Sequence, residues 1–230
     1  ALKQCQHPTI VRFYGFSLKD FFGNKRCTLF LDYYRNESLA TLIKKDDYKT
    51  AISNTQKQII LIGIARGMLH IHQNHIIHND LKPANVLLDD DLHSHVTDFG
   101  FSKYCESYEP TLSMSTGIGT SFYMAPEIIS NDVKTTKVDV YSFGILMFEV
   151  ITGCRPYEHQ KNVGKFYNDI VTENLRPKTT MPIKSSIKNL MEKCWSRYPD
   201  RRPTFDEIFK MLAYGKDPVL NIDDQSYYLD

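Results

Sequence analysis

The hydrophobic positions along the chain predict a small β portion followed by a mostly helical body. Two segments rich in β-branched and aromatic residues, 10–17 and 27–34, flank a turn-like DFFGNKR stretch, which predicts a β-hairpin. Between 76 and 98, short apolar pieces alternate with polar turns and predict several short strands. Strands followed by a run of helices are typical of the α+β class, which is the fold class that we expect.

Helices are expected where apolar residues recur every three or four positions. A shorter helix is expected over 38–46, and a more apolar one over 138–152. The longest such segment, 54–74, has apolar residues on one side of the expected helix at Ile60, Leu61, Ile64, Met68 and Ile71. Residues 160 to about 213 predict three amphipathic helices, separated by Pro177, Pro182, Pro199 and Pro203.

Two stretches have no periodic pattern. Residues 99–124 are polar and rich in Ser, Thr and Gly, and a loop of this length inside a compact domain is usually functional or disordered. Residues 214–230 are polar and are expected to form a loose tail. The chain begins ALKQCQHPTIVRF, without Met and already amphipathic, so we expect the sequence to start in the middle of a domain.

Composition narrows the class of protein. A hydrophobic content of 42% is ordinary for a globular domain, and a net charge of +1 argues against a nucleic-acid-binding face. The apolar runs are shorter than the roughly 20 residues that cross a bilayer, so no membrane span is expected. The cysteines are odd in number and lack C-x-x-C spacing, which favours reduced thiols in a cytoplasmic protein; they are Cys5, Cys27, Cys105, Cys154 and Cys194.

The stretch IIHNDLKPANVLLDD, residues 76–90, holds a carboxylate, an ammonium group and an amide within six residues. Asp80 can accept a proton from a substrate hydroxyl, and Lys82 places a cation beside a transferred group. Asn85 offers a carbonyl oxygen suited to Mg²⁺, and Asp98 in VTDFG offers a carboxylate for the same ion. Phosphoryl transfer needs this combination, although the same residue types also occur simply as turn formers at loop starts.

The motifs HNDLKPAN, DFG and GTSFYMAPE, in this order, resemble the signature set of protein kinases. Two later segments, DVYSFGILMFEVITGCRPY and CWSRYPDRRPTFDEI, are also similar to kinase sequences. The resemblance covers residues 1 to about 213. It implies a protein-kinase-like fold with a mostly α-helical C-lobe and a partial β N-lobe, in which the Gly-rich loop and the first three strands are missing.

The resemblance also implies a division of the chain and a function. Residues 1–34 would be an N-lobe remnant with the end of a helix, two strands and the hinge. Residues 35–213 would be the C-lobe, with the activation segment at 98–127, and 214–230 a tail. The Lys of DLKPAN together with the CW…RPTF ending is typical of tyrosine-kinase-like serine/threonine kinases. Such an enzyme transfers the γ-phosphate of ATP, with Mg²⁺, to protein Ser or Thr hydroxyls.

Individual residues receive roles from the resemblance. Asp80, Lys82 and Thr120 would be catalytic, and Asn85 and Asp98 would hold Mg²⁺. Leu31 would be the gatekeeper residue, and Leu87 would lie under the adenine ring. The hinge that meets the adenine would be formed by Asp32, Tyr33 and Tyr34. A regulatory spine would be formed by Leu2, Phe13, His78 and Phe99. Asp139 would anchor the catalytic loop, and Glu127 would form a buried ion pair with Arg202.

One departure from the kinase pattern is Asn79, which stands where most of the family has Arg. That Arg reads a phosphate on the activation segment through bidentate bonds, and the uncharged Asn cannot replace it. We therefore expect a weak response to phosphorylation of this segment, for which Lys103 offers only a lesser contact. The candidate phosphorylation sites are Ser113, Ser115 and Thr116.

A second departure is the absence of a G-x-G-x-x-G motif and of a strand-borne VAIK-type Lys from these 230 residues. Loss of one well-placed electrostatic donor typically costs a factor of about 10²–10³ in rate. This chain is therefore expected to be a fragment with little activity alone. The alternative is a truncated, pseudokinase-like module that binds protein partners. A small-molecule kinase of similar fold is less consistent with GTSFYMAPE, which resembles the peptide-positioning segment of protein kinases.

The histidines invite a different interpretation, a metal site formed by His70, His72, His75 and His78. Their spacing crosses from the end of a helix into a loop, so they cannot share one face, and packed or spine positions are expected instead. Trp195 is expected in the core.

Overall fold

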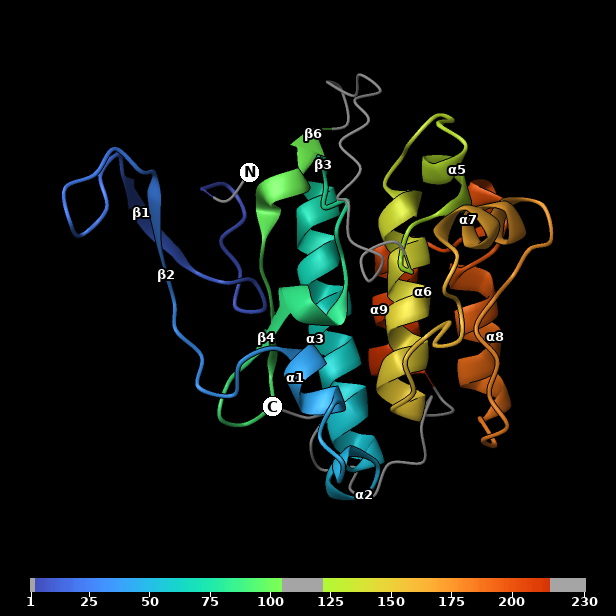
Figure 1. Ribbon diagram of the computed structural model, residues 1–230. Helices are drawn as coiled ribbons and strands as arrows, with labels where there is room; N and C mark the ends of the chain where they lie inside the picture. Colours follow the sequence, from blue (N-terminus) through green and yellow to red (C-terminus); the bar gives the residue numbers. More distant parts are fainter. Residues whose placement is uncertain (1–2, 105–121, 216–230) are drawn as a thin grey trace.

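The computed structural model describes residues 3–104 and 122–215. It consists of a helical body and a β-hairpin that projects from one side of it (Figure 1). The positions predicted at Leu2, Ser113, Ser115, Thr116 and Thr120 lie outside the described residues.

The hairpin pairs β1 (Phe13–Ser17) with β2 (Thr28–Leu31) in antiparallel fashion, as predicted. Both strands are shorter than the segments expected from the sequence. Ile10 and Val11 instead join the body, because Ile10 bridges Val96 and the Val11 amide donates to the Val96 carbonyl at 2.9 Å. This backbone link ties the start of the hairpin to the site described below.

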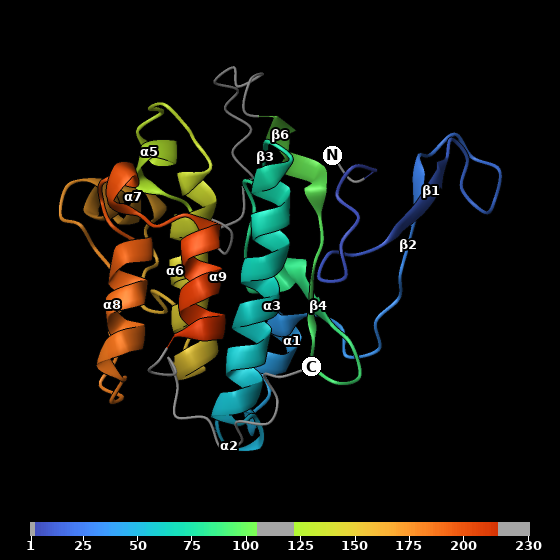
Figure 2. The ribbon, with the colours of Figure 1, turned by 180° about the vertical axis from the view of Figure 1, so that it is seen from behind.

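The helical body is built around α3 (Asn54–Gln73) and α6 (Lys137–Thr152), both close to their predicted bounds. A capping box between Ser53 and Gln56 starts α3, and its predicted apolar positions are buried. On its other sides, α3 packs against α9 (Phe205–Tyr214) and β5 (Ser94–Val96). Figure 2 shows α3 and α9 side by side from behind.

The most apolar helix, α6, is buried along almost its whole length and packs against α8 (Ser185–Cys194). Gly144 allows this close approach, since a Cβ at that position would lie 2.9 Å from the Cβ of Cys194. The three helices predicted between 160 and 213 are confirmed as α7 (Val163–Val171), α8 and α9. Trp195 is buried, as expected.

Short elements connect these helices and include α5 (Pro126–Ile129). Strands β3 (Ile76–Ile77), β4 (Val86–Leu88) and β5 confirm the short strands expected between 76 and 98. β4 pairs with β5, and β3 pairs with β6 (Lys103–Tyr104). The 3₁₀ turns η1 (Pro83–Asn85), η2 (Phe99–Phe101) and η4 (Pro199–Arg201) complete the described elements.

Two boundaries predicted from the sequence were wrong. The helix expected over 38–46 is present but shorter, as α1 (Leu39–Ile43), because the polar run from Lys44 to Asp47 has no apolar side to bury; a separate short helix that was not predicted, α2 (Tyr48–Ala51), follows it. The structureless loop expected from residue 99 begins instead with η2 and then β6, and β6 is held by its pairing to β3. No helix in the described part of the chain has the length and apolar character needed to cross a membrane.

Candidate active site

The predicted catalytic loop leaves β3, passes through η1 and enters β4, which brings Asp80, Lys82 and Asn85 together. The Lys82 ammonium donates to Oδ2 of Asp80 at 2.7 Å. The Asn85 amide donates to the same oxygen at 2.9 Å and to the Asp80 backbone carbonyl at 2.8 Å. Asp80 is only 7% exposed, so these donors stabilise a carboxylate that is largely withdrawn from water. The three residues thus form one hydrogen-bonded unit.

Asp139, in the first turn of α6, holds this loop from below. Its carboxylate is fully buried and accepts the backbone amides of His78 and Asn79, each at 2.8 Å. The ring of His72, on α3, lies 2.8 Å from the same carboxylate. His72 was expected only as a packed residue, and its polar contact was missed because nothing in the sequence indicates which acid faces it. The two longest helices therefore fix the backbone of the catalytic loop jointly.

The candidate metal ligands, Asn85 and Asp98, lie at the same end of the β4–β5 ladder. Val86 pairs with Val96, and the Thr97 amide donates to the Asn85 carbonyl at 3.0 Å. Asp98 is exposed, has a left-handed backbone (φ 62°), and accepts the Gly100 amide at 3.2 Å. The Asn85 amide nitrogen faces Asp80, which leaves its carbonyl oxygen as a ligand. An amide oxygen and a carboxylate fit a hard divalent cation.

No cluster of three or more His, Cys, Asp or Glu side chains suited to a metal occurs among the residues that the structure covers. The histidines considered as ligands have other neighbours. His70 packs against His7 at 5.0 Å between ring centroids, and His78 packs against Phe99 at 5.4 Å.

His78 is held in one tautomer by its hydrogen bonds. The Asp80 amide lies 3.3 Å from Nδ1, so Nδ1 is the acceptor, and Nε2 then donates to the Thr97 carbonyl at 3.0 Å. This places the ring between the catalytic loop and the Asp98 strand. Of the other expected spine residues, Phe13 is half-buried on β1 and pairs with Leu31 across the hairpin.

The predicted adenine-site residues are only partly brought together. Tyr34 stacks on His95 at 4.4 Å, and His95 pairs with Leu87 across the ladder, so Tyr34 and Leu87 lie on one side of it. Asp32 accepts the Tyr14 hydroxyl at 2.6 Å. Burial, with the nearby Asp32 carboxylate, raises the pKa of Tyr34 to about 12. Tyr33, by contrast, is 87% exposed and does not line the predicted adenine site.

Glu127 and Arg202 form a buried bidentate pair, with Nη1–Oε1 at 2.5 Å and Nη2–Oε2 at 2.8 Å. The guanidinium also donates to the carbonyls of Ser196 and Lys137, at 2.9 Å each, and lies over the ring of Tyr141. The pair joins α5, at the end of the predicted activation segment, to the turn before α9. The partners that the resemblance implies are thus in contact.

Asn79 makes a contact that the sequence did not predict. Its side-chain amide donates to the Phe101 carbonyl at 3.1 Å, across from the catalytic loop to η2. The residue has a left-handed backbone with φ 66°, a region where Asn is several-fold enriched. That preference is the only signal in the sequence that could have pointed to it.

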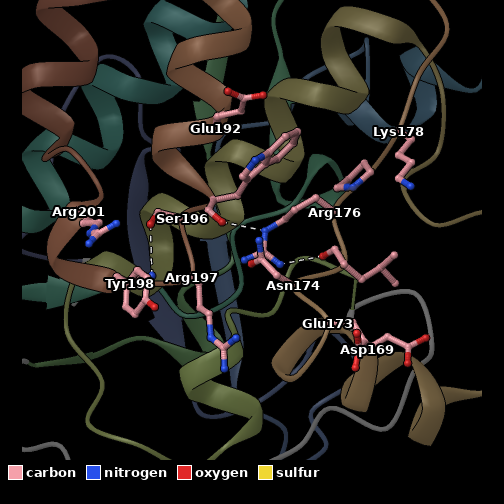
Figure 3. Close-up of a pocket in the computed structure, with 13 residues that line it drawn as sticks. Asp169, Glu173, Asn174, Arg176, Lys178, Glu192, Ser196, Arg197, Tyr198 and Arg201 are labelled. Carbon is pink, nitrogen blue, oxygen red and sulfur yellow. Dashed lines mark hydrogen bonds between the residues drawn. The ribbon is translucent and has the colours of Figure 1, made fainter.

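A separate cavity of about 790 Å³ lies between the end of α7 and the end of α8 (Figure 3). Arg176 crosses it and donates to the carbonyls of Trp195 at 2.8 Å and Leu175 at 2.7 Å. Its guanidinium also lies over the Tyr141 ring, 5.0 Å from the centroid. None of the predicted site residues lines this cavity, and the bonds of Arg176 are those of a residue that ties two segments together.

Comparison with known proteins agrees with the geometry. A family model described as protein kinase domain matches residues 1–212. The RGS domain-containing serine/threonine-protein kinase A of Dictyostelium discoideum is 37% identical over 183 residues, which is 80% of this chain and 15% of that protein. The dual specificity protein kinase shkD of the same organism is 34% identical over 224 residues, or 96% of this chain and 29% of that protein.

A third relative is the putative serine/threonine-protein kinase/receptor R826 of Acanthamoeba polyphaga mimivirus. It is 36% identical over 214 residues, which cover 92% of this chain and 12% of that protein. The chain thus spans less than a third of the length of each of these relatives. The family model and the names of these relatives confirm the predicted family and fold, and the chain belongs to the protein kinase domain family.

Proposed function

We propose that the domain transfers the γ-phosphate of Mg²⁺-ATP to Ser or Thr hydroxyls of a protein substrate. A protein kinase domain implies the use of ATP, a divalent metal and a protein acceptor; the choice of Mg²⁺ is part of the proposal. The observation that carries it is the unit formed by Asp80, Lys82 and Asn85, in which two donors converge on one buried carboxylate oxygen.

Asp80 is assigned the task of orienting the acceptor hydroxyl and receiving its proton. Lys82 and Asn85 both contact Oδ2, and among the described residues Oδ1 has no hydrogen-bond partner, so Oδ1 is the oxygen that meets the substrate. Lys82 also places its positive charge beside the transferred group, where negative charge accumulates. Thr120, which lies outside the described residues, is proposed to complete this group.

Asn85 and Asp98 are the residues that would hold Mg²⁺. When bound there, a divalent cation would supply positive charge against the phosphates of ATP. The chain presents the two oxygen ligands from adjacent ends of β4 and β5. The backbone pairing of these two strands fixes the positions of those ends. Leu31, Asp32, Tyr33, Tyr34 and Leu87 are proposed to contact the adenine.

A second candidate function is a protein-binding module without catalysis. It is favoured by the absence of a G-x-G-x-x-G motif from these 230 residues, which themselves supply no such backbone loop to cover the phosphates. A nucleotide-dependent rise in melting temperature distinguishes the two. A rise with ATP and Mg²⁺ would favour the enzyme, and its absence would favour the module.

The remaining assignments extend the proposal. The division at residues 34 and 213, the activation segment at 98–127 and the tyrosine-kinase-like subgroup rest on the motifs. A cytoplasmic location is supported by the free thiols of the four cysteines that the structure describes. Nucleic-acid binding is not part of the proposed function, because the net charge is only +1.

Phosphoryl transfer is tested with the Asp80→Asn variant, which keeps the shape of the side chain but removes the proton acceptor. Transfer to a generic protein substrate should fall by about 10²–10⁴-fold, while the nucleotide-dependent rise in melting temperature persists. Equal activity in the two proteins would show that Asp80 does not perform the chemistry. Loss of the nucleotide effect together with activity would instead indicate a damaged fold.

A further inference from the structure

The turn of the β1–β2 hairpin exposes two adjacent aromatic rings. Phe21 is 87% exposed and Phe22 90% exposed, and Leu18 beside them is 72% exposed. Large apolar side chains are not normally clustered on a solvent-exposed surface. An exposed apolar cluster of this kind therefore marks a site that binds a membrane or the apolar surface of another molecule. We name residues 18–26 the hairpin tip.

The backbone of the hairpin tip is ordered by one carboxylate. Asp20 accepts the amides of Phe22 and Asn24, each at 2.9 Å, and the Asn24 side chain at 3.0 Å. The Asp20 amide also donates to the Asn24 carbonyl, and Gly23 takes the left-handed conformation (φ 82°) that closes the turn. These bonds lower the pKa of Asp20, led by that from the Asn24 side chain. The turn therefore holds the phenylalanines outward by its own bonding.

Cations surround the rings. Lys19, Lys25 and Arg26 are exposed, and no ion pair holds any of them among the residues described. Asp20 is the only acid in the hairpin tip, so its three cations leave a net charge of +2 in nine residues. The whole chain has a net charge of +1, so the residues outside the hairpin tip together carry a net charge of −1.

The position of the hairpin tip leaves it accessible to a flat surface. The turn between β1 and β2 is the part of the hairpin farthest from the helical body in both ribbon views (Figures 1 and 2). A planar partner can therefore reach Phe21 and Phe22 without meeting the helices. The catalytic loop, which lies in the body, stays open while the hairpin tip is engaged.

We propose that the hairpin tip is a membrane-contact site that inserts Phe21 and Phe22 into the interface of an anionic bilayer. Aromatic side chains favour the boundary between headgroups and acyl chains, and basic residues beside them are attracted to anionic lipid. The phenylalanine rings are exposed, cations flank them, and the one carboxylate is already hydrogen-bonded within the turn. These three features together favour a lipid surface over a structured acidic protein. A protein partner would need polar groups to match, and the hairpin tip offers few besides its cations.

The test is co-sedimentation of the full 230-residue chain with phosphatidylcholine vesicles, prepared with and without phosphatidylserine. Binding should occur with phosphatidylserine and weaken as salt rises through 0.1 M, where the Debye length is about 10 Å. The double variant Phe21→Ser/Phe22→Ser should lose at least about tenfold in partitioning, as should Lys25→Glu/Arg26→Glu. Both pairs are exposed, so the melting temperature should not change.

A matched control is Val133→Ser/Tyr198→Ser, which removes two exposed apolar side chains, 85% and 56% exposed, from the helical body. This variant should bind vesicles like the unmodified chain. Insertion is read directly with Phe22→Trp, because the only native tryptophan, Trp195, is buried and contributes a constant background. Its emission should shift to shorter wavelength with anionic vesicles only.

Three results would overturn the proposal: no vesicle binding, binding that survives Phe21→Ser/Phe22→Ser, or binding without a shift in emission from Phe22→Trp. The last result, with competition by polyglutamate, would assign the hairpin tip to an acidic protein partner instead.

Discussion

The side-chain amide of Asn79 donates a hydrogen bond to the Phe101 carbonyl at 3.1 Å and so joins the catalytic loop to the segment that follows Asp98. The position normally carries an Arg whose link to the activation segment depends on a phosphate. Here the link is direct and involves no charge. The two strands beside this contact, β3 and β6, are paired as well, so the residues that follow Asp98 are held in place without any modification.

Asn79→Ala should release this segment. The substitution removes the bond to Phe101 and places Ala at φ 66°, and the two effects together should cost about 1–3 kcal/mol of unfolding free energy. Asn131→Ala is the matched control, because Asn131 has φ 57° but no side-chain bond among the described residues. Only Asn79→Ala should speed amide exchange at residues 100–102. Equal exchange in the two variants would contradict the role given to the Asn79 amide.

Phosphorylation of the activation segment should have little effect on activity. Asn79 cannot form the bidentate, charge-assisted bonds through which an Arg binds a phosphate on this segment. Phosphatase treatment should therefore change the rate of phosphoryl transfer by less than about tenfold. The sites to examine are Ser113, Ser115 and Thr116. Asn79→Arg should increase the response. An increase of several orders of magnitude upon phosphorylation of the unmodified chain would show that another cation replaces the missing Arg.

Arg202→Met should destabilise the domain strongly. It leaves the buried Glu127 carboxylate without its partner, which typically costs about 3–5 kcal/mol. Chemical denaturation measures this loss. Glu127→Leu/Arg202→Met should be less destabilised than the single variant, because no unpaired charge remains. Lys210→Met breaks an exposed pair with Asp206 and should have no measurable effect.

Glu149 should make stability depend on pH. Burial raises its pKa, although the Tyr123 hydroxyl and Arg155 act in the opposite direction. The folded chain therefore binds this proton more tightly than the unfolded chain, in which the pKa is about 4.3. The stabilisation is complete below that pH and is lost as the pH rises through the raised pKa.

Denaturation midpoints over this pH range should separate Glu149→Gln from the unmodified chain. The variant should lack this decline, whereas Glu192→Gln, at a side chain that is 53% exposed, should retain it. Parallel curves for Glu149→Gln and the unmodified chain would show that Glu149 does not titrate in this range.

Asp98→Asn should raise the Mg²⁺ concentration needed for nucleotide to stabilise the domain. Loss of a supporting residue at a metal site typically weakens binding by 10–100-fold, and loss of a direct ligand should cost at least about tenfold. Asp90→Asn changes an exposed acid in the turn between β4 and β5 and should leave the requirement unchanged. A metal requirement unaffected by Asp98→Asn would remove Asp98 from the ligand set.

The sequence was most informative where local pattern decides structure. The spacing of Ile60, Leu61 and Ile64 fixed α3, and the order of motifs placed Asp80, Lys82 and Asn85 in one site. It was least informative where distant residues meet. Strands β3 and β6 have two residues each, too few for a period, and their pairing depends on the fold of the residues between them. The contacts of His72 with Asp139 and of Asn79 with Phe101 could not be predicted either, because these partners are distant in the sequence and meet only in the folded domain.

The burial of Asp139 has a consequence for the motions of the catalytic loop. The amides of His78 and Asn79 donate to a carboxylate that belongs to the first turn of the most buried helix. These amides can meet solvent only when the contact between the loop and α6 opens. Hydrogen exchange at His78 should therefore be as slow as exchange in the core of α6, and far slower than at Gly100, whose acceptor is the exposed Asp98. The loop to which we assign the chemistry is thus expected to be among the last parts of the domain to unfold.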